Sequence, residues 1–283
     1  GRIYQRPFPA GSLQDRPDNG ESCLLNSCRE PYSKMKNRIS RLLVVVLLAL
    51  PLTAAAQIGD HRNDFAIGVN GGYVLSNVGF TPSVRQSIHG GVTGGLSVRY
   101  VCEKYFNTIC SIYGEVNYAS IGWKEKILTG TDQPVINSNG AAEAYSRTVN
   151  YIQIPVFAHL AWGREQNGFN FFFQAGPQLG LYLGESTSKN YDTPNLANDG
   201  TGRSNAVTAQ ESMPVEKKVD YGIAAGLGLE YSNRHVGHFL LEARYYYGLG
   251  NIYGSSKKDY FGKSNYGNIV VKATYLFDII KTK

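Results

Sequence analysis

Apolar and polar residues alternate one by one along the last third of the chain. In residues 219–231 every second position is Val, Tyr, Ile, Ala or Leu, and the positions between them hold Asp, Gly, Ala or Glu. The pattern returns in residues 239–247 and 269–277. A period of two places successive side chains on opposite faces of a β-strand. The sequence therefore predicts three strands, each with an apolar, aromatic face and a face of glycine, tyrosine and charge.

The same alternation predicts five earlier strands, in residues 65–75, 92–100, 112–118, 151–162 and 169–183. Two architectures alternate in this way. A soluble sandwich or lipocalin-like barrel turns its apolar face inward. A transmembrane β-barrel turns it toward lipid and needs about 10 residues for each crossing. The alternation alone does not say which face is the outside.

The lengths of the connections favour the membrane barrel. They alternate strictly between long and short, and the longest span residues 122–147, 185–216 and 250–266. Outer-membrane barrels have short periplasmic turns and long extracellular loops. Aromatic residues also fall at the strand ends, as the two girdles of such a barrel do; these are Phe65, Tyr100, Trp162, Phe169, Tyr231, Phe239 and Phe277 near short turns or a terminus, and Tyr73, Tyr118, Tyr221 and Tyr247 near long loops. We therefore expect an all-β fold, an eight-stranded antiparallel transmembrane up-and-down β-barrel.

A different pattern occupies residues 35–56. Met35 is followed by a basic stretch, the apolar run LLVVVLLAL in residues 42–50, and an A-x-A site ending at Ala56. This order predicts a secretory signal peptide, and the apolar run is too short to cross a bilayer as a helix. A buried core helix is the alternative. Residues 1–34 show no period and are expected to be an unstructured upstream extension. Residues 57–283 are then the barrel domain, exported to the bacterial outer membrane.

Composition and charge support this division. The 283 residues include 32 glycines and 20 tyrosines, and 18% are charged, against about 25% in soluble proteins. The formal net charge is +6. Residues 1–56 hold eight basic and four acidic residues, which leaves 20 basic and 18 acidic residues in the barrel domain. This near balance argues against a nucleic-acid partner.

Four segments carry a resemblance to a known family. They read YIQIPVFAHLAW at 151–162, FFQAGPQLGLYLG at 172–184, DYGIAAGLGLEY at 220–231 and LEARYYYGLGNI at 241–252. In this order they resemble the I-P, A-G-P, G-x-G-x-E and Y-G-L segments of the PorT-like outer-membrane β-barrel family, also called the outer membrane protein beta-barrel domain. The resemblance covers residues 57–283. It implies an eight-stranded barrel in the outer membrane and, for one member of the family, a role in protein secretion.

Seven charged residues fall on the faces predicted to line the lumen: Arg99, Glu115, Asp220, Glu230, Glu242, Arg244 and Lys272. The interior of an eight-stranded barrel is just wide enough for side chains to fill. We expect these residues to form a buried network of ion pairs and hydrogen bonds that plugs the lumen. A narrow path for small solutes is the alternative.

No pattern in the sequence indicates catalysis, a cofactor or a metal. The five histidines are scattered, and neither an H-E-x-x-H motif nor a nucleophile elbow is present. Cys102 and Cys110 flank a short turn, and the alternation places both side chains on the outward face. A cross-hairpin disulfide is therefore one prediction and free thiols are the other. Pro155 lies within a strand and lacks a backbone donor, which predicts a bulge there.

Two functions follow from these expectations. The first is a structural or interaction barrel, set in outer-membrane lipid, whose long loops meet an extracellular ligand. The second is an accessory component of a secretion apparatus that binds other secretion-machinery proteins. A small-solute porin and a lipid-modifying barrel enzyme are less favoured, and the protein is expected not to be an enzyme.

Overall fold

The computed structural model describes residues 60–164, 167–254 and 259–281, and strands make up most of this part of the chain. The strands are β1 (Asp60–Thr81), β2 (Gln86–Ser87), β3 (His89–Tyr105), β4 (Thr108–Glu125), β5 (Tyr145–Gly163), β6 (Gly168–Lys189), β7 (Val219–Asn233), β8 (Gly237–Gly248) and β9 (Lys263–Ile280). A four-residue helix, α3 (Ala209–Ser212), precedes β7. Among the described residues, no helix has the length and apolar character needed to cross a membrane.

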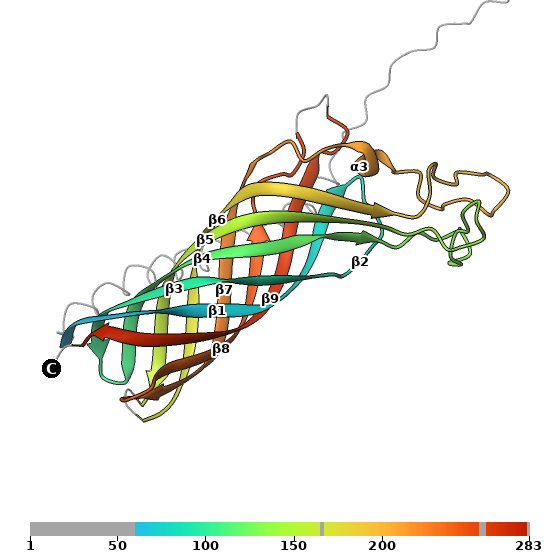
Figure 1. Cartoon of the computed structure of the whole chain (residues 1–283). Coiled ribbons are helices and arrows are strands. Elements are labelled where there is room, and N and C mark those ends of the chain that lie inside the picture. Colours follow the sequence, from blue (N-terminus) through green and yellow to red (C-terminus); the bar gives the residue numbers. More distant parts are fainter. Residues whose placement is uncertain (1–59, 165–166, 255–258, 282–283) are drawn as a thin grey trace, which may run out of the picture. The chain divides into compact units, whose positions relative to one another are not determined.

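The eight long strands close into a ring (Figure 1). Their order is β4-β3-β1-β9-β8-β7-β6-β5, and a further pairing of β5 with β4 completes the circle. Neighbours in the ring are antiparallel, and each long strand pairs with the long strands before and after it in sequence. The short strand β2 only adds two pairs at the end of β4. The prediction of an eight-stranded antiparallel up-and-down barrel is confirmed.

The apolar faces of the strands lie on the outside of the ring. Leu96 and Leu241 are 64% and 59% exposed, whereas Glu115 and Lys272 on the inner faces are 3% and 2% exposed. An apolar belt of this extent is not stable in water and marks a lipid-facing surface. The predicted girdle is present too, with ring pairs such as Phe169–Tyr231 at 5.0 Å and Phe239–Tyr275 at 4.8 Å between centroids.

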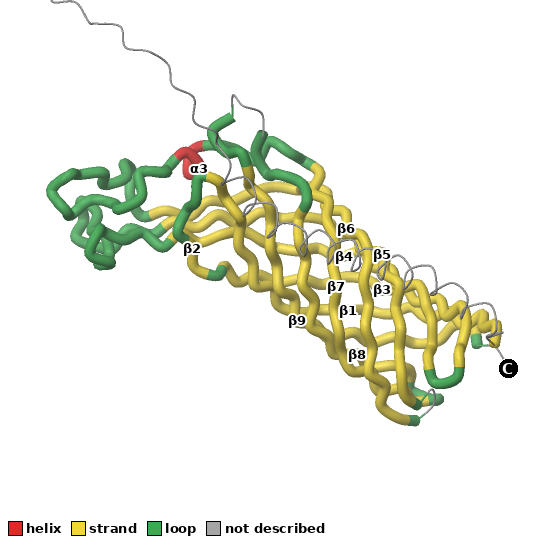
Figure 2. Tube along the Cα trace, turned by 180° about the vertical axis from the view of Figure 1, so that it is seen from behind, coloured by secondary structure: helices red, strands yellow, loops and turns green. Residues whose placement is uncertain are grey.

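Long loops gather at one end of the barrel and short turns at the other (Figure 2). The long connections cover residues 82–88, 126–144, 190–218 and 249–262, and the short ones cover 106–107, 164–167 and 234–236. The strands are longer than their alternation predicted, because they continue beyond the apolar belt. On β4, for example, the outward girdle residue is Tyr118 but the strand runs on to Glu125.

The bulge expected at Pro155 is not present. The pairing of β5 with β6 keeps one register from Pro155↔Gln178 to Ala158↔Ala175, and the irregularity lies instead between Asn150 and Tyr151. Val156 and Phe157, between those two pairs, have no partner on β6, although both pair with β4. This gap lies opposite Gly176 and Pro177 of β6, whereas the gap at Pro155 itself is in the β4–β5 ladder, between Gly114↔Val156 and Asn117↔Gln153, and the register is the same on both sides of it.

Candidate functional site: the barrel lumen and its two ends

Four charged residues meet in the middle of the lumen. Arg244 on β8 binds both oxygens of Glu115 across the barrel, at 3.0 and 3.1 Å, and binds Glu242 at 2.6 Å. Lys272 on β9 also binds Glu115 and lies 3.3 Å from Glu242. All four side chains are buried. Two cations and two carboxylates therefore neutralise one another in a low-dielectric interior, where an unpaired charge would be costly.

Glycines make room for this cluster. Gly72 on β1 lies opposite Lys272 in the register, and a Cβ at Gly72 would come within 2.3 Å of the Lys272 Cβ. Gly228 on β7 similarly faces the ring of Phe172, whose nearest atom would be 2.5 Å from an added Cβ. An inward glycine thus lies beside a large inward side chain on the neighbouring strand, which allows the narrow lumen to be filled.

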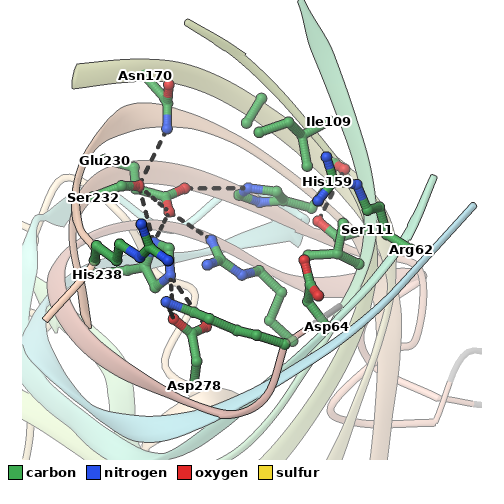
Figure 3. A pocket seen from close by; sticks show the side chains of 15 residues that line it. Arg62, Asp64, Ile109, Ser111, His159, Asn170, Glu230, Ser232, His238 and Asp278 are labelled. Atoms are coloured by element: carbon green, nitrogen blue, oxygen red, sulfur yellow. Dashed lines mark hydrogen bonds and ion pairs between the residues drawn. The ribbon is translucent and has the colours of Figure 1, made fainter. Parts of the chain in front are cut away.

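A second charged cluster lies at the short-turn end and lines the pocket drawn in Figure 3. Arg99 binds Glu230 at 2.7 Å. His238 lies between two carboxylates, with Nδ1 at 2.7 Å from Glu230 and Nε2 at 3.0 Å from Asp278. The ring of His159 is tilted against that of Phe172, at 4.7 Å between centroids, and its Nε2 lies 4.0 Å from Glu230. These groups line a cavity of about 190 Å³ to which all eight long strands contribute.

His238 and Asp278 were not among the residues predicted to line the lumen. Both have the inward parity of their strands, but the predicted strands began at residue 239 and ended at residue 277. Each therefore lay one position outside a predicted strand, in what was expected to be a turn or a tail. The inward–outward alternation extends to both residues, but the predicted strands stopped one residue short of each.

Six of the seven predicted lumen residues form ion pairs, and Asp220 differs. It accepts a hydrogen bond from Tyr246 Oη at 2.7 Å, and no ion pair to it is seen in the described part of the chain. It belongs to a tyrosine-rich layer in which Tyr151 and Tyr266 lie edge to face at 5.8 Å. The lumen therefore contains three separate polar layers, and the sequence could not distinguish them because parity gives the face of a residue and not its depth.

The long-loop end of the lumen holds a cluster of buried aromatic rings that the sequence did not predict, with the buried side chain of Arg147 over the ring of Trp123 at 5.4 Å. Phe80, Trp123, Tyr253 and Phe261 are buried together, with Phe80 at 5.5 Å from Trp123, 6.3 Å from Tyr253 and 5.0 Å from Phe261. We call these four residues the aromatic plug. Beyond the apolar belt the wall has water outside it, and the inward side chains then pack as in the core of a soluble protein.

The two longest loops are tied together beside the aromatic plug. Arg203 of the β6–β7 loop binds Glu143 of the β4–β5 loop at 2.7 Å and also binds Glu211. Its guanidinium lies 4.7 Å from the ring of Tyr191. Backbone bonds cross between the loops as well, such as Ser204 N–H to Leu128 O at 2.9 Å. The loops therefore form one packed lobe, defined as residues 126–144 and 190–208.

Glu125 is buried at the foot of this lobe, beyond the membrane-facing belt of β4. Gln210 Nε2 donates to its Oε1 at 2.9 Å. Burial raises the pKa of Glu125 from the ordinary value of 4.5 to about 7, and the nearby Glu211 carboxylate acts in the same direction. This carboxyl group therefore changes charge near neutral pH.

Cys102 and Cys110 lie on β3 and β4 beside the first short turn. Cys110 pairs with Glu103, and the register shifts between Val101 and Glu103, so Cys102 sits in an irregular part of the ladder. Both residues are free thiols in this structure. The disulfide between them stays a prediction.

A closed ring of eight antiparallel strands, with an apolar exterior and a buried charged interior, defines the class of outer-membrane β-barrels. In agreement, residues 55–254 match the family model described as the outer membrane protein beta-barrel domain. The chain belongs to this family.

Comparison with solved structures finds other outer-membrane proteins. Ail of Yersinia pestis, solved with the heparin analogue sucrose octasulfate, is 13% identical, with 76% of this chain and 99% of Ail covered and a TM-score of 0.31. Neisserial surface protein A is 12% identical, with 75% of this chain and 97% of that protein covered and a TM-score of 0.37. OprG of Pseudomonas aeruginosa is 9% identical, with 77% of this chain and 98% of OprG covered and a TM-score of 0.35. The search of curated proteins found no match.

Proposed function

We propose that this outer-membrane protein is a closed, non-enzymatic barrel that acts through the lobe formed by its long loops. The observation that carries the proposal is the filling of the lumen at several depths. The Arg244–Glu115–Lys272 cluster occupies the middle, and the aromatic plug occupies the long-loop end. A solute would have to displace both, one by separating buried ion pairs and the other by opening a packed core.

The order of the lobe supports an interaction role. The Arg203 ion pairs and the bonds between the loops fix its backbone before any partner binds, which lowers the conformational cost of binding. Ile136 and Leu196 remain exposed on it. Large exposed apolar side chains on an ordered surface are suited to contact with another macromolecule or ligand.

Electrical recording from the protein in planar bilayers tests this function. We expect little or no steady current, whereas a porin reconstituted in parallel conducts. A large ohmic conductance would show an open path and would restore the small-solute porin. The Lys272→Met variant should stay silent too, because the aromatic plug remains in place.

An accessory role in secretion is the second candidate. It is supported by the resemblance of four wall segments to PorT-like proteins and by the cavity at the short-turn end, which offers a partner a concave surface. The short turns themselves provide little further docking surface, which favours the first function. Co-purification of the protein with secretion-machinery subunits from its native membrane would reverse the preference.

Export by a signal peptide also belongs to this proposal. Residues 1–56 lie outside the described residues, and only their sequence pattern supports cleavage after Ala56 and the division at residues 34 and 56. The intact mass and the N-terminal sequence of the protein purified from outer membranes should identify Gln57 as the first residue. A mature chain that retains residues 42–50 would contradict the proposed cleavage.

A further inference from the structure

The cavity at the short-turn end extends from the rim of the barrel into the lumen (Figure 3). Exposed side chains at the strand ends, among them Arg234 and Lys281, form its rim, and the buried Arg99, His159 and Asn170 form its inner part. Its volume of about 190 Å³ is larger than that of a cavity of roughly 150 Å³ that holds benzene. The cavity therefore has room for one six-membered ring with small substituents.

The buried charges around the cavity cancel one another. Arg99 binds Glu230, and the two ring nitrogens of His238 face the carboxylates of Glu230 and Asp278 at 2.7 and 3.0 Å. Both nitrogens donate, because a carboxylate only accepts, so His238 carries a positive charge. Lys281 also contacts Asp278, but it is exposed to water, which screens its charge. A charged ligand would therefore enter the inner part without a counter-charge, which is unfavourable.

One buried amide at the cavity has an oxygen without a donor. Ser232 Oγ donates to Glu230 Oε1 at 3.1 Å, so it accepts from Asn170 Nδ2 at 3.3 Å. This bond fixes the orientation of the Asn170 amide. Asn170 Oδ1 is then an acceptor with no hydrogen-bond partner in the described part of the chain. Arg99 Nε is a buried donor that likewise has no partner there.

A second acceptor is fixed in the same way on His159. Gln174 Nε2 donates to Glu242, so Gln174 Oε1 accepts from His159 Nδ1 at 3.2 Å. The other ring nitrogen, Nε2, is therefore the unprotonated one of a neutral imidazole. It lies 4.0 Å from Glu230 Oε2, too far for a hydrogen bond, and has no partner among the residues that the structure describes. Two acceptors on the neighbouring strands β5 and β6 thus lack a donor.

We propose that this cavity binds a neutral sugar, with one six-membered ring inside it. A hydroxyl group both donates and accepts, so sugar hydroxyls can donate to Asn170 Oδ1 and His159 Nε2 and accept from Arg99 Nε. The side chains of Val101 and Ile109 provide apolar surface for the C–H groups of the ring. A free monosaccharide and the terminal sugar of a glycan chain present the same chemistry to the cavity.

NMR titration of the full-length protein, in a detergent whose headgroup is not a sugar, tests the proposal. The probes are D-glucose, D-galactose and N-acetyl-D-glucosamine, and the comparators are cyclohexanol and the zwitterion L-leucine. We expect at least one sugar to bind roughly tenfold more tightly than either comparator, because each comparator lacks several hydroxyl groups. Failure of all three sugars to bind would overturn the proposal, as would a comparator that binds as tightly as the best sugar.

Two substitutions on β5 form a matched pair. Ala161→Leu adds volume to the buried wall of the cavity, and Ala158→Leu adds the same volume on the exposed, outward face. We expect Ala161→Leu to abolish sugar binding and Ala158→Leu to leave it unchanged. Asn170→Leu removes an acceptor but no charge and should weaken binding roughly fivefold; it remains informative if the Ala161→Leu variant does not fold. Unchanged affinity in the folded Ala161→Leu variant, or in Asn170→Leu, would overturn the proposal.

The dimer of the best-binding sugar distinguishes the two sources. Equal or tighter binding of the dimer would assign the cavity to the end of a glycan chain that continues past the rim. Loss of binding would assign it to a free monosaccharide, and in both cases the proposal stands.

Discussion

In the middle of the barrel the lumen is filled by two cations and two carboxylates, and at the long-loop end four aromatic rings pack together beside the buried Arg147. The wall around both is the same kind of ladder, but its surroundings differ. Lipid surrounds the middle, so the only polar environment for inward side chains is the lumen itself. At the long-loop end, water lies outside the wall, and the inside becomes the only apolar environment.

This difference predicts different responses to substitution. In the charge cluster each group depends on particular partners, because a buried charge without a partner keeps its full desolvation cost. In the aromatic plug the contacts are non-directional, and another apolar side chain of similar volume can replace a ring. The middle should therefore be sensitive to conservative changes and the long-loop end tolerant of them.

The largest effect is expected from Lys272→Met. The substitution keeps the length of the side chain but leaves Glu115 and Glu242 with Arg244 as their remaining cation. The free energy of unfolding should fall by about 3–5 kcal/mol, as measured by urea unfolding in lipid vesicles. Lys124→Met, at an exposed position, is the control and should change little. A loss below about 1 kcal/mol for Lys272→Met would contradict a charge-dependent middle.

The next effect concerns pH and Glu125, at the foot of the lobe. Its folded-state pKa of about 7 lies above the ordinary 4.5, so on raising the pH the unfolded chain loses this proton first. The free energy of unfolding should fall between about pH 4.5 and 7 and stay lower above pH 7, by about 3 kcal/mol. Glu125→Gln should abolish this fall, and Asp132→Asn, on the exposed part of the lobe, should leave it intact.

A smaller effect is expected from Phe261→Leu in the aromatic plug. Leucine keeps most of the apolar contact with Phe80 and Tyr253, so the free energy of unfolding should fall by only about 1 kcal/mol. The same vesicle assay measures it, beside Lys272→Met. If the two substitutions destabilised the barrel equally, the distinction between the two regions would be lost.

The smallest effect is expected from the two cysteines. A bond between Cys102 and Cys110 would close a hairpin that the β3–β4 ladder already holds, so its reduction should change stability by about 1 kcal/mol or less. Mass mapping without reductant is expected to find the two peptides linked. Complete alkylation of both thiols in protein isolated from the outer membrane would remove the predicted disulfide.

The fold was predictable because each of the eight strands shows the period of two, and because long and short connections alternate along the whole barrel domain. Face assignment followed from parity, and all seven predicted lumen residues are buried. Partners were not predictable, since Arg244 and Glu115 meet across the lumen from strands that are not neighbours, and their relative depth depends on strand tilt and register. The aromatic plug was also missed, because the alternation stopped being apolar outside and polar inside where β1 and β4 leave the belt.

Thiol labelling at two adjacent residues of β7 tests most directly whether the lumen is closed and the apolar face is outside. Ala224 points inward and is 0% exposed, whereas Ala225 is exposed on the outer face. In vesicles, with Cys102 and Cys110 replaced by serine, the Ala225→Cys variant should react with a lipid-soluble maleimide, and the Ala224→Cys variant should react with no reagent until unfolded. Fast reaction of the Ala224→Cys variant with a charged, water-soluble maleimide would show an open lumen and contradict the account.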